Sequence, residues 1–351
     1  TFTSSNPNIL SINGTTATVH AAGEVTITAK AAVNDVYLEA YDVKKHAVIS
    51  SGITYQFLGK SNDTWEPAIG GGIFKLDTNG QNFQYLFDID GELVCPMIQN
   101  RNGKVFASIS GNNNSGLYEF EVNQQNANLI ENGLIYSMIE VSGIIYYVKI
   151  EDTTLQIYSL NKDLNKALIY SSLINKTGEY PTLIEGLNDD IYLLTHSQGQ
   201  NQLGSIVSIK LDGSQFTTLH EFSQRHSQYF LTKVDNSYFG IISNNNYNSA
   251  LFKFSPINGF ELIHEFNHEF NINCKLTYFE NSLYGIYDGG DANRGRIFKI
   301  ATDGTSFELI KSFTEETSPM YTSWWGELNL LPDNSFIGSL SVSGENKGAQ
   351  I

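Results

Sequence analysis

One phrase recurs along this chain, and it constrains the fold more than any other feature of the sequence. Each copy joins a strand-like segment, of which IFKL is typical, to a second apolar segment that ends in HEF or a close variant. Clear copies occupy residues 70–89, 204–222, 249–266 and 295–313. Because self-similarity means that one supersecondary unit is copied, a period in the forties made only of strand-like segments predicts the blades of a β-propeller.

The same period can be followed through the less obvious copies by one apolar position in the IFKL-type strand. The residues at this position are Phe74, Tyr118, Tyr158, Val207, Phe252 and Phe298. Their numbers differ by 40 to 49 residues, which suits four short strands in each unit.

Each unit is expected to contain four strand types in a fixed order. The IFKL-type strand comes first, and an Asx-Gly turn connects it to the LHEF-type strand, as at Asn79-Gly80, Asp212-Gly213 and Asp303-Gly304. Such turns favour the positive φ angles of a tight hairpin. A third strand begins near a Tyr or Pro, as at residues 180–184, and an LYG-type strand follows it.

The number of blades follows from the ends of the repeat array. A lone LYG-type strand at 52–57 precedes the first unit, and a lone IFKL-type strand at 348–351 follows the last. Six blades would therefore leave unpaired strand edges at both ends, which sheets avoid. We predict an all-β propeller of seven blades, with six as the alternative. In this interpretation the last blade is incomplete, and its remaining strands are expected beyond Ile351.

Composition excludes some classes of partner. The chain has 37 acidic and 21 basic residues and a pI near 4.8, which argues against nucleic acid or an anionic membrane surface. No stretch approaches the roughly 20 apolar residues that span a bilayer. The chain begins with Thr1 and no signal sequence precedes the repeats, so we expect a processed protein or a piece of a longer one.

The recurring phrases resemble the GloVer, or Gloeo-Verruco, tandem repeat of secreted bacterial proteins. In that family a GTIFKL strand, a DG turn, an F-x-x-L-H-x-F strand and an LYG strand follow one another. The resemblance covers residues 51–351, although 121–126 and 161–165 replace the DG turn in the second and third units. It implies a propeller on a secreted or cell-surface protein, and it carries no catalytic residues to transfer.

The first fifty residues are of a different kind. The segments SSNP at 4–7, TITA at 26–29 and NDVYLEA at 34–40 resemble the second half of a bacterial immunoglobulin-like domain of group 2. This resemblance implies a partial Ig-like β-sandwich at 1–50, of the kind that acts as a spacer, before the propeller at 51–351. Alternation of apolar and polar residues from Val25 to Ala29 independently predicts a half-buried strand.

Residues 264–268 match the H-E-x-x-H pattern of zinc metalloproteases. That pattern needs a helix, because only there do residues four apart share a face and reach one zinc. The repeat places His264 on an LHEF-type strand, where His220 has the equivalent position, and residues four apart on a strand are separated by about 13 Å. We therefore expect structural histidines and no metal or other cofactor.

The two cysteines and one acidic loop are further candidates. Cys95 and Cys274 occupy similar positions in distant units, which predicts two buried, free thiols rather than a disulfide. The loop at 288–293 has the oxygen ligands of a calcium site, but a solvated loop is the preferred interpretation.

The best candidates for ligand binding are aromatic residues outside the repeat pattern. Adjacent tryptophans point to opposite faces of a strand, so one of Trp324 and Trp325 is expected to be exposed. Tyr321 lies beside them, and Trp65 lies in a loop that faintly resembles the Asp-box of sialidase-like propellers. Exposed rings near a propeller mouth would suit stacking on a sugar.

No set of residues in the sequence converges on a catalytic arrangement. The favoured hypothesis is a non-catalytic, extracellular module of a large bacterial protein that acts in adhesion or ligand binding. Its expected partners are a surface glycan or another cell-surface protein. One alternative is a carbohydrate-active lyase or hydrolase with its site in the propeller funnel. Another is a structural spacer or secreted cargo without a ligand.

Overall fold

The computed structural model is all-β: the described residues form strands and no α-helix, so none could cross a membrane as a helix. The described residues are 2–14, 16–20, 23–30, 43–49, 53–59, 71–77, 84–89, 91–95, 97–100, 104–111, 115–121, 126–174, 180–196, 199, 202–223, 230–243, 249–266, 274–287, 295–313, 322–330, 334, 336–342 and 349–350.

Strands β6 to β32 form seven antiparallel sheets, which are the blades of a propeller. Blade 1 consists of β6 (Ile53–Gly59), β7 (Gly71–Asp77) and β8 (Gln84–Ile89). Blade 2 consists of β9 (Glu92–Leu93), β10 (Ile98–Gln99), β11 (Val105–Ser110), β12 (Gly116–Glu121) and β13 (Asn126–Asn132). Blade 3 consists of β14 (Ile135–Val141), β15 (Ile144–Glu151), β16 (Thr154–Leu160) and β17 (Lys166–Leu173). Blades 4 and 5 consist of β18 (Thr182–Glu185), β19 (Asp190–Thr195), β20 (Ser205–Lys210) and β21 (Phe216–Glu221); and β22 (Thr232–Val234), β23 (Ser237–Ser243), β24 (Ser249–Ser255) and β25 (Gly259–Glu265). Blades 6 and 7 consist of β26 (Thr277–Phe279), β27 (Ser282–Tyr287), β28 (Arg296–Ala301) and β29 (Glu308–Ser312); and β30 (Thr322–Leu330), β31 (Phe336–Val342) and β32 (Ala349–Gln350).

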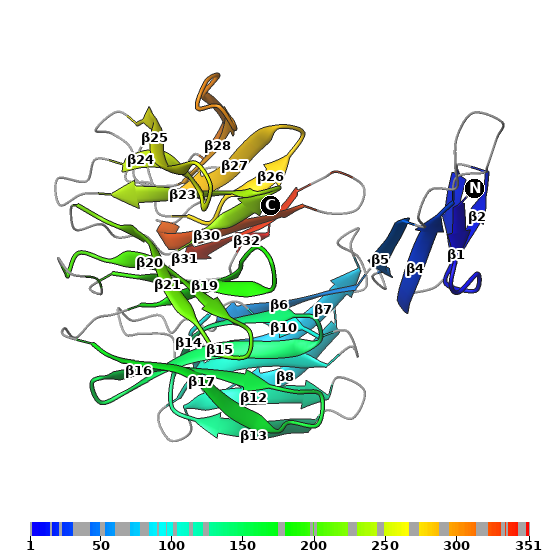
Figure 1. Cartoon of the computed structure of the whole chain (residues 1–351), viewed down its shortest axis with the longest axis horizontal. Helices are drawn as coiled ribbons and strands as arrows, with labels where there is room; N and C mark the ends of the chain where they lie inside the picture. Colours follow the sequence, from blue (N-terminus) through cyan, green and yellow to red (C-terminus); the bar gives the residue numbers. More distant parts are fainter. Residues whose placement is uncertain are drawn as a thin grey trace.

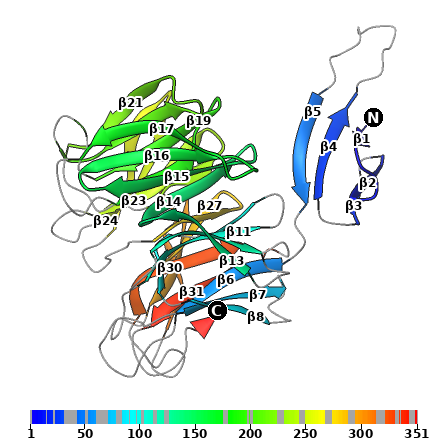
Figure 2. The same cartoon turned by 90° about the horizontal axis from the view of Figure 1, so that it is seen from below.

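Each complete blade starts with the strand that begins near Tyr or Pro and continues with the LYG-type, IFKL-type and LHEF-type strands. A blade therefore spans the junction of two sequence units. In blades 2 to 7 the first strand is the inner one, and contacts join successive inner strands, as from β10 to β14 and from β14 to β18. Figures 1 and 2 show the blades side by side in chain order. The seven described sheets agree with the predicted blade number.

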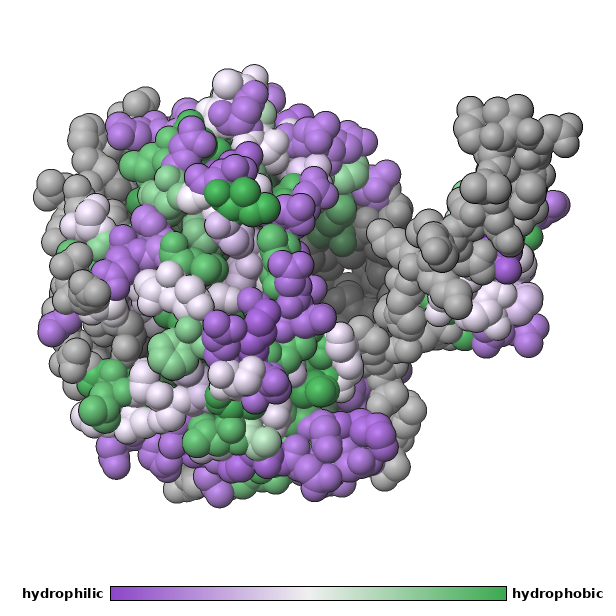
Figure 3. Space-filling view, in the orientation of Figure 1, coloured by the Kyte–Doolittle hydropathy of each residue, from purple (hydrophilic) through white to green (hydrophobic). Residues whose placement is uncertain are grey.

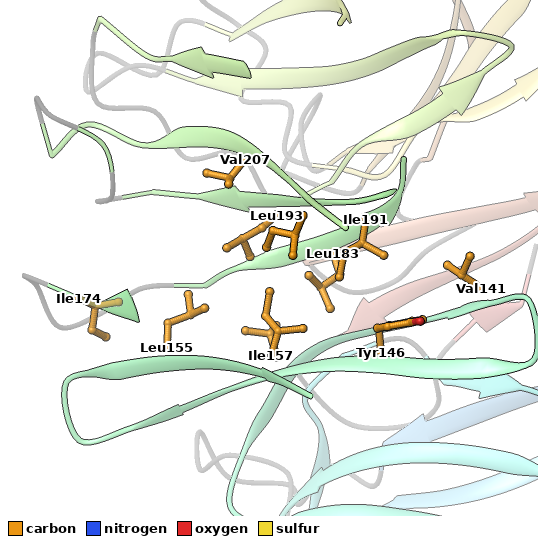
Figure 4. Packing of buried hydrophobic residues seen from close by; sticks show 11 residues of the cluster. Val141, Tyr146, Leu155, Ile157, Ile174, Leu183, Ile191, Leu193 and Val207 are labelled. Atoms are coloured by element: carbon orange, nitrogen blue, oxygen red, sulfur yellow. The ribbon is translucent and has the colours of Figure 1, made fainter. Parts of the chain in front are cut away.

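The hydrophobic core is divided among the interfaces between neighbouring blades. The cluster between blades 3 and 4 is an example: side chains from β14, β15 and β16 pack against side chains from β18, β19 and β20 (Figure 4). Its labelled members include Leu155, Ile157, Leu183 and Leu193. Apolar residues on both faces of the sheets thus hold each blade between its neighbours.

The LYG motif is explained by close packing inside a blade. Gly285 on β27 pairs with Phe298 on β28, and a Cβ atom at Gly285 would lie 2.5 Å from the Phe298 ring. Gly240 and Phe252 repeat this arrangement in blade 5. In blades 5 and 6 a glycine is therefore needed opposite this phenylalanine, whereas in blade 1 Phe74 pairs with Gln56 instead.

A β-bulge recurs at one position in the outer strand of blades 1 to 6. At each, the pairing of the third and outer strands shifts by one residue beside the apolar position that defined the sequence period. The unpaired residues are Leu86, Ile130, Ile169, Leu219, Ile263 and Ile310. Bulges bend a strand and increase its twist, so this position is part of the fold rather than a defect.

The Asp-Gly turns dock onto these bulges. Gly213 has a φ of 74° and Gly304 a φ of 80°, as predicted for the turns. A side chain at Gly213 would overlap the carbonyl of Ile169 in the preceding blade, and one at Gly304 would overlap the carbonyl of Ile263. The Asn79-Gly80 turn lies outside the described residues. We call the end of the propeller that carries these turns the Asp-Gly face.

The LHEF motif forms a clamp between blades. His220 stacks on Phe260 of the next blade with ring centroids 4.4 Å apart, and Phe222 meets the same ring edge-on at 5.6 Å. His264 and Phe266 hold Phe307 in the same way, at 5.7 and 5.4 Å. Each aromatic pair contributes about 0.5–1.5 kcal/mol beyond the burial of its area.

The N-terminal strands form two sheets of their own. Strands β1 (Phe2–Ser4), β4 (Gly23–Ala29) and β5 (Val43–Ile49) pair in one, and β2 (Leu10–Asn13) and β3 (Thr16–Val19) in the other. Figure 1 shows them apart from the blades. The predicted strand from Val25 to Ala29 is present, with Val25 buried. The Ig-like assignment itself stays a prediction.

Candidate functional site

The predicted binding residues are placed only in part. Trp324 and Trp325 lie on β30, the inner strand of blade 7, where the pairing with β31 shifts between Thr322 and Gly326. Their side chains are outside the described part of the chain. Tyr321 and Trp65 also lie outside the described residues. The backbone thus places the tryptophan pair in an irregular segment at the start of an inner strand.

The H-E-x-x-H match is not a metal site of the helical type. His264 lies on strand β25, as predicted, and its Nδ1 is 2.9 Å from the carbonyl oxygen of Gly304. His268 lies outside the described residues. No group of three or more His, Cys, Asp or Glu side chains among the described residues could hold a metal ion. His264 therefore serves the contact between blades 5 and 6.

His220 occupies the equivalent position in blade 4. It is half-buried between Phe222 and Phe260, and burial lowers the pKa of its imidazole. A neutral ring is favoured in this position because no water solvates its stacked face. The structural role expected from the repeat is therefore the one that the described contacts support.

Both cysteines are buried and free, as predicted. Cys95 precedes β10 in blade 2 and Cys274 precedes β26 in blade 6. Burial raises the pKa of each thiol to about 12. Thiols of this kind are inert, because the reactive form is the thiolate.

The described residues do contain an aromatic pair beside an inner strand. Tyr136 of blade 3 and Tyr180, just before the inner strand of blade 4, meet edge-to-face with ring centroids 6.0 Å apart. The side chain of Tyr180 is 50% exposed, whereas Tyr136 is half-buried. Burial, with a contribution from Tyr180, raises the pKa of the Tyr136 phenol, so it stays protonated at neutral pH.

Local structure fixes the position of Tyr136. Pairing between β14 and β15 shifts between Ile135 and Ser137, so Tyr136 is the extra residue of a bulge. Neighbouring blades secure both flanks: the Ile135 amide donates to Ser108 Oγ at 3.1 Å, and Ser137 Oγ accepts from the Leu183 amide at 3.0 Å. Bulges often redirect a side chain next to a binding site.

Tyr180 is placed by the residues that follow it. Pro181 is buried directly before β18, and proline is tolerated at the start of an edge strand because no N–H is needed there for pairing. Tyr180 and Tyr136 therefore lie where inner strands begin, at the end of the propeller opposite the Asp-Gly face. The irregular start of β30, with Trp324 and Trp325, lies at the same end.

The sequence analysis did not identify this pair. It singled out aromatic residues at the start of an inner strand in blade 7, but it took Tyr180 only as a marker of where a strand begins. The Tyr-Pro dipeptide was the available signal. Nothing in the sequence indicated that Tyr136 would lie in a bulge.

Comparison with known proteins supports the fold alone. A protein from Lactobacillus plantarum has a TM-score of 0.55 and 11% identity to this chain, with 85% of this chain and 91% of that one covered. The fold is a β-propeller. TolB from Acinetobacter baumannii is also similar, with a TM-score of 0.49, 12% identity and coverage of 81% and 75%. No family model and no curated protein matches the chain.

Proposed function

We propose that this chain is a non-catalytic, extracellular propeller module that binds a glycan where the inner strands of blades 3 and 4 begin. The observation that carries the proposal is the half-exposed ring of Tyr180, held edge-on against Tyr136 beside the inner strands. A tyrosine presents an apolar face and a hydroxyl together, which suits the faces and hydroxyl groups of a sugar.

The surroundings of this pair support binding more than catalysis. Tyr136 keeps its proton at neutral pH, so it can donate a hydrogen bond but is not poised as a base. The acidic character of the chain, with a net charge of −16, favours a neutral or cationic ligand over a polyanion. Location at the cell surface and a role in adhesion rest on the resemblance of the repeats to those of secreted proteins.

A glycan array with the labelled chain tests the proposal, followed by calorimetric titration of the best ligand. We expect saturable binding to a neutral glycan and at least about a tenfold loss of affinity in Tyr180→Ala, since one stacking contact is removed. Tyr85→Ala changes an exposed tyrosine on the outer strand β8 and should bind as the wild type does.

Three outcomes would count against this function. A Tyr180→Ala variant that binds the glycan with normal affinity would show that the glycan does not bind at Tyr180. Turnover of a polysaccharide or glycoside in an activity screen would show that the chain is a carbohydrate-active enzyme, the main alternative. Absence of any bound glycan on the array would favour a spacer or cargo role.

A further inference from the structure

The outer strand of blade 3 differs from the outer strands that carry the aromatic clamp. Counting from the bulge, Tyr170 and Ser172 have the positions that His220 and Phe222 have in blade 4. Tyr170 contacts Phe216 of the next blade at 5.6 Å, but Ser172 supplies no second ring. Phe216 is consequently 63% exposed, whereas the clamped phenylalanines of the next two blades are half-buried.

Exposed apolar side chains flank β17 on both of its faces. Leu168 and Leu173 share the face of Lys166, toward blade 2, and Phe216 lies beyond the opposite face, toward blade 4. Leu168 is 52% exposed and Leu173 is 71% exposed, both on β17, and Phe216 begins the neighbouring β21. Figure 3 shows hydrophobic residues in patches among hydrophilic ones on the side of the molecule where Figure 1 labels β17. Exposed apolar groups on an edge strand favour association with another chain.

Strand β17 is also distinctive in its charge. Each of the outer strands β8, β13, β21, β25 and β29 contains at least one Asp or Glu, whereas β17 contains none. The one charged residue of β17, Lys166, is paired with Glu131 of blade 2 at 2.5 Å. In a chain with a net charge of −16, β17 is therefore the described outer strand at which two copies meet with the least repulsion.

We propose that two copies of this chain associate through β17, with the strands antiparallel across a two-fold axis. A two-fold interface brings the same surface of both copies together, so a strand without carboxylates faces another without carboxylates. Leu173 and Phe216 of each copy become buried in the contact. The partner copy thereby covers the ring that the missing clamp residue leaves exposed. This inference is independent of the glycan site, which lies beside the inner strands.

The mass of the chain in solution tests the interface. Light scattering after size-exclusion chromatography should give twice the chain mass of 39.0 kDa. Leu168→Glu/Leu173→Glu should return the mass to that of one chain, because it places carboxylates in the contact. Leu262→Glu is the matched control, because Leu262 has the position of Leu168 on β25 and is 47% exposed. It should remain dimeric.

Cross-linking tests whether β17 lies in the contact. Ser171 is exposed on β17, and Ser171→Cys should form a disulfide-linked dimer on mild oxidation. Cys95 and Cys274 do not interfere, because both are buried. Thr217→Cys on β21 should stay unlinked.

Three results would overturn the interface. The first is a single-chain mass for the wild type at about 0.1 mM, a concentration at which a dimer with a micromolar dissociation constant would be saturated. The second is a dimer that survives the double substitution. The third is cross-linking at Thr217→Cys in preference to Ser171→Cys. Circular dichroism and thermal unfolding of every variant will show that a change in mass does not reflect misfolding.

Discussion

Blades 4 and 5 differ from blades 2 and 3 in how their outer strands hold the next blade. In blades 4 and 5, a histidine and a phenylalanine enclose a ring of the next blade. In blade 2 the equivalent contact is the ion pair between Glu131 and Lys166, and in blade 3 it is a single edge-on ring contact. The aromatic clamp is therefore present at two of these four contacts between blades, and at the contact of blade 3 its absence leaves Phe216 of the next blade exposed.

The largest expected effect is on the clamp itself. Phe222→Ala should lower the free energy of unfolding by about 4 kcal/mol, because it removes a fully buried ring at the contact between blades 4 and 5. Phe216→Ala is the matched control on the exposed ring of the irregular contact, and its cost should stay below about 1 kcal/mol. Urea unfolding measures both, and equal costs would contradict the distinction.

The docking of the Asp-Gly turn on the bulge predicts the next effect. Gly304→Ala should cost about 3 kcal/mol, because it adds a backbone overlap with Ile263 to the strain of a positive φ. Gly259→Ala isolates the strain, since Gly259 has a φ of 80° and no atom within 4 Å of an added Cβ. Gly259→Ala should cost about 1 kcal/mol of unfolding free energy. A cost of Gly304→Ala no larger than this would show that docking of the turn on the bulge does not contribute to stability.

The ion pair of blade 2 predicts a smaller effect. Burial alone would raise the pKa of Glu131, but Lys149 and Lys166 hold it below its ordinary value. Glu131→Gln should cost about 2 kcal/mol at pH 7, because Lys149 loses its closest carboxylate.

The pH dependence gives this contact a separate check. Because the folded pKa is lowered, the stabilisation is present above the unfolded pKa near 4.5 and is lost as the pH falls below it. Wild type and Glu131→Gln should converge in stability as the pH is lowered through this range. A constant difference would argue against the ionised pair.

The smallest effect concerns the histidine of the clamp. Burial lowers the pKa of His220, so the folded chain binds fewer protons than the unfolded chain below the ordinary value of 6.5. Stability should therefore decline as the pH falls from 7 to 5. His220→Phe keeps an aromatic ring and removes the proton site, so it should show less of this decline. An identical pH profile for both would exclude His220 as a source.

The fold could be predicted because its signals are local and repeated. Apolar alternation and Asx-Gly turns identify strands and hairpins, and one period orders them into blades. The clamp explains why the LHEF phrase recurs, and the strand assignment of His264 excluded a helical zinc motif. These features depend on residues close in sequence or at one repeat distance.

The candidate site could not be predicted in the same way. Tyr136 contacts Tyr180 only because a bulge in β14 meets the start of β18 from the next blade. A bulge changes which side chain faces outward without a strong mark in the sequence. The exposure of Phe216 depends likewise on the small side chain of Ser172, forty-four positions earlier, which matters only after the blades are aligned.

A double-mutant cycle on Phe222 and Phe260 tests the central claim that the repeated phrase is a clamp between blades. The two rings meet edge-on at 5.6 Å, so the coupling free energy in urea unfolding should be about 1 kcal/mol. The equivalent positions Ser172 and Phe216 of the irregular contact should give a coupling near zero. Coupling between Phe222 and Phe260 within about 0.3 kcal/mol of zero would contradict the account.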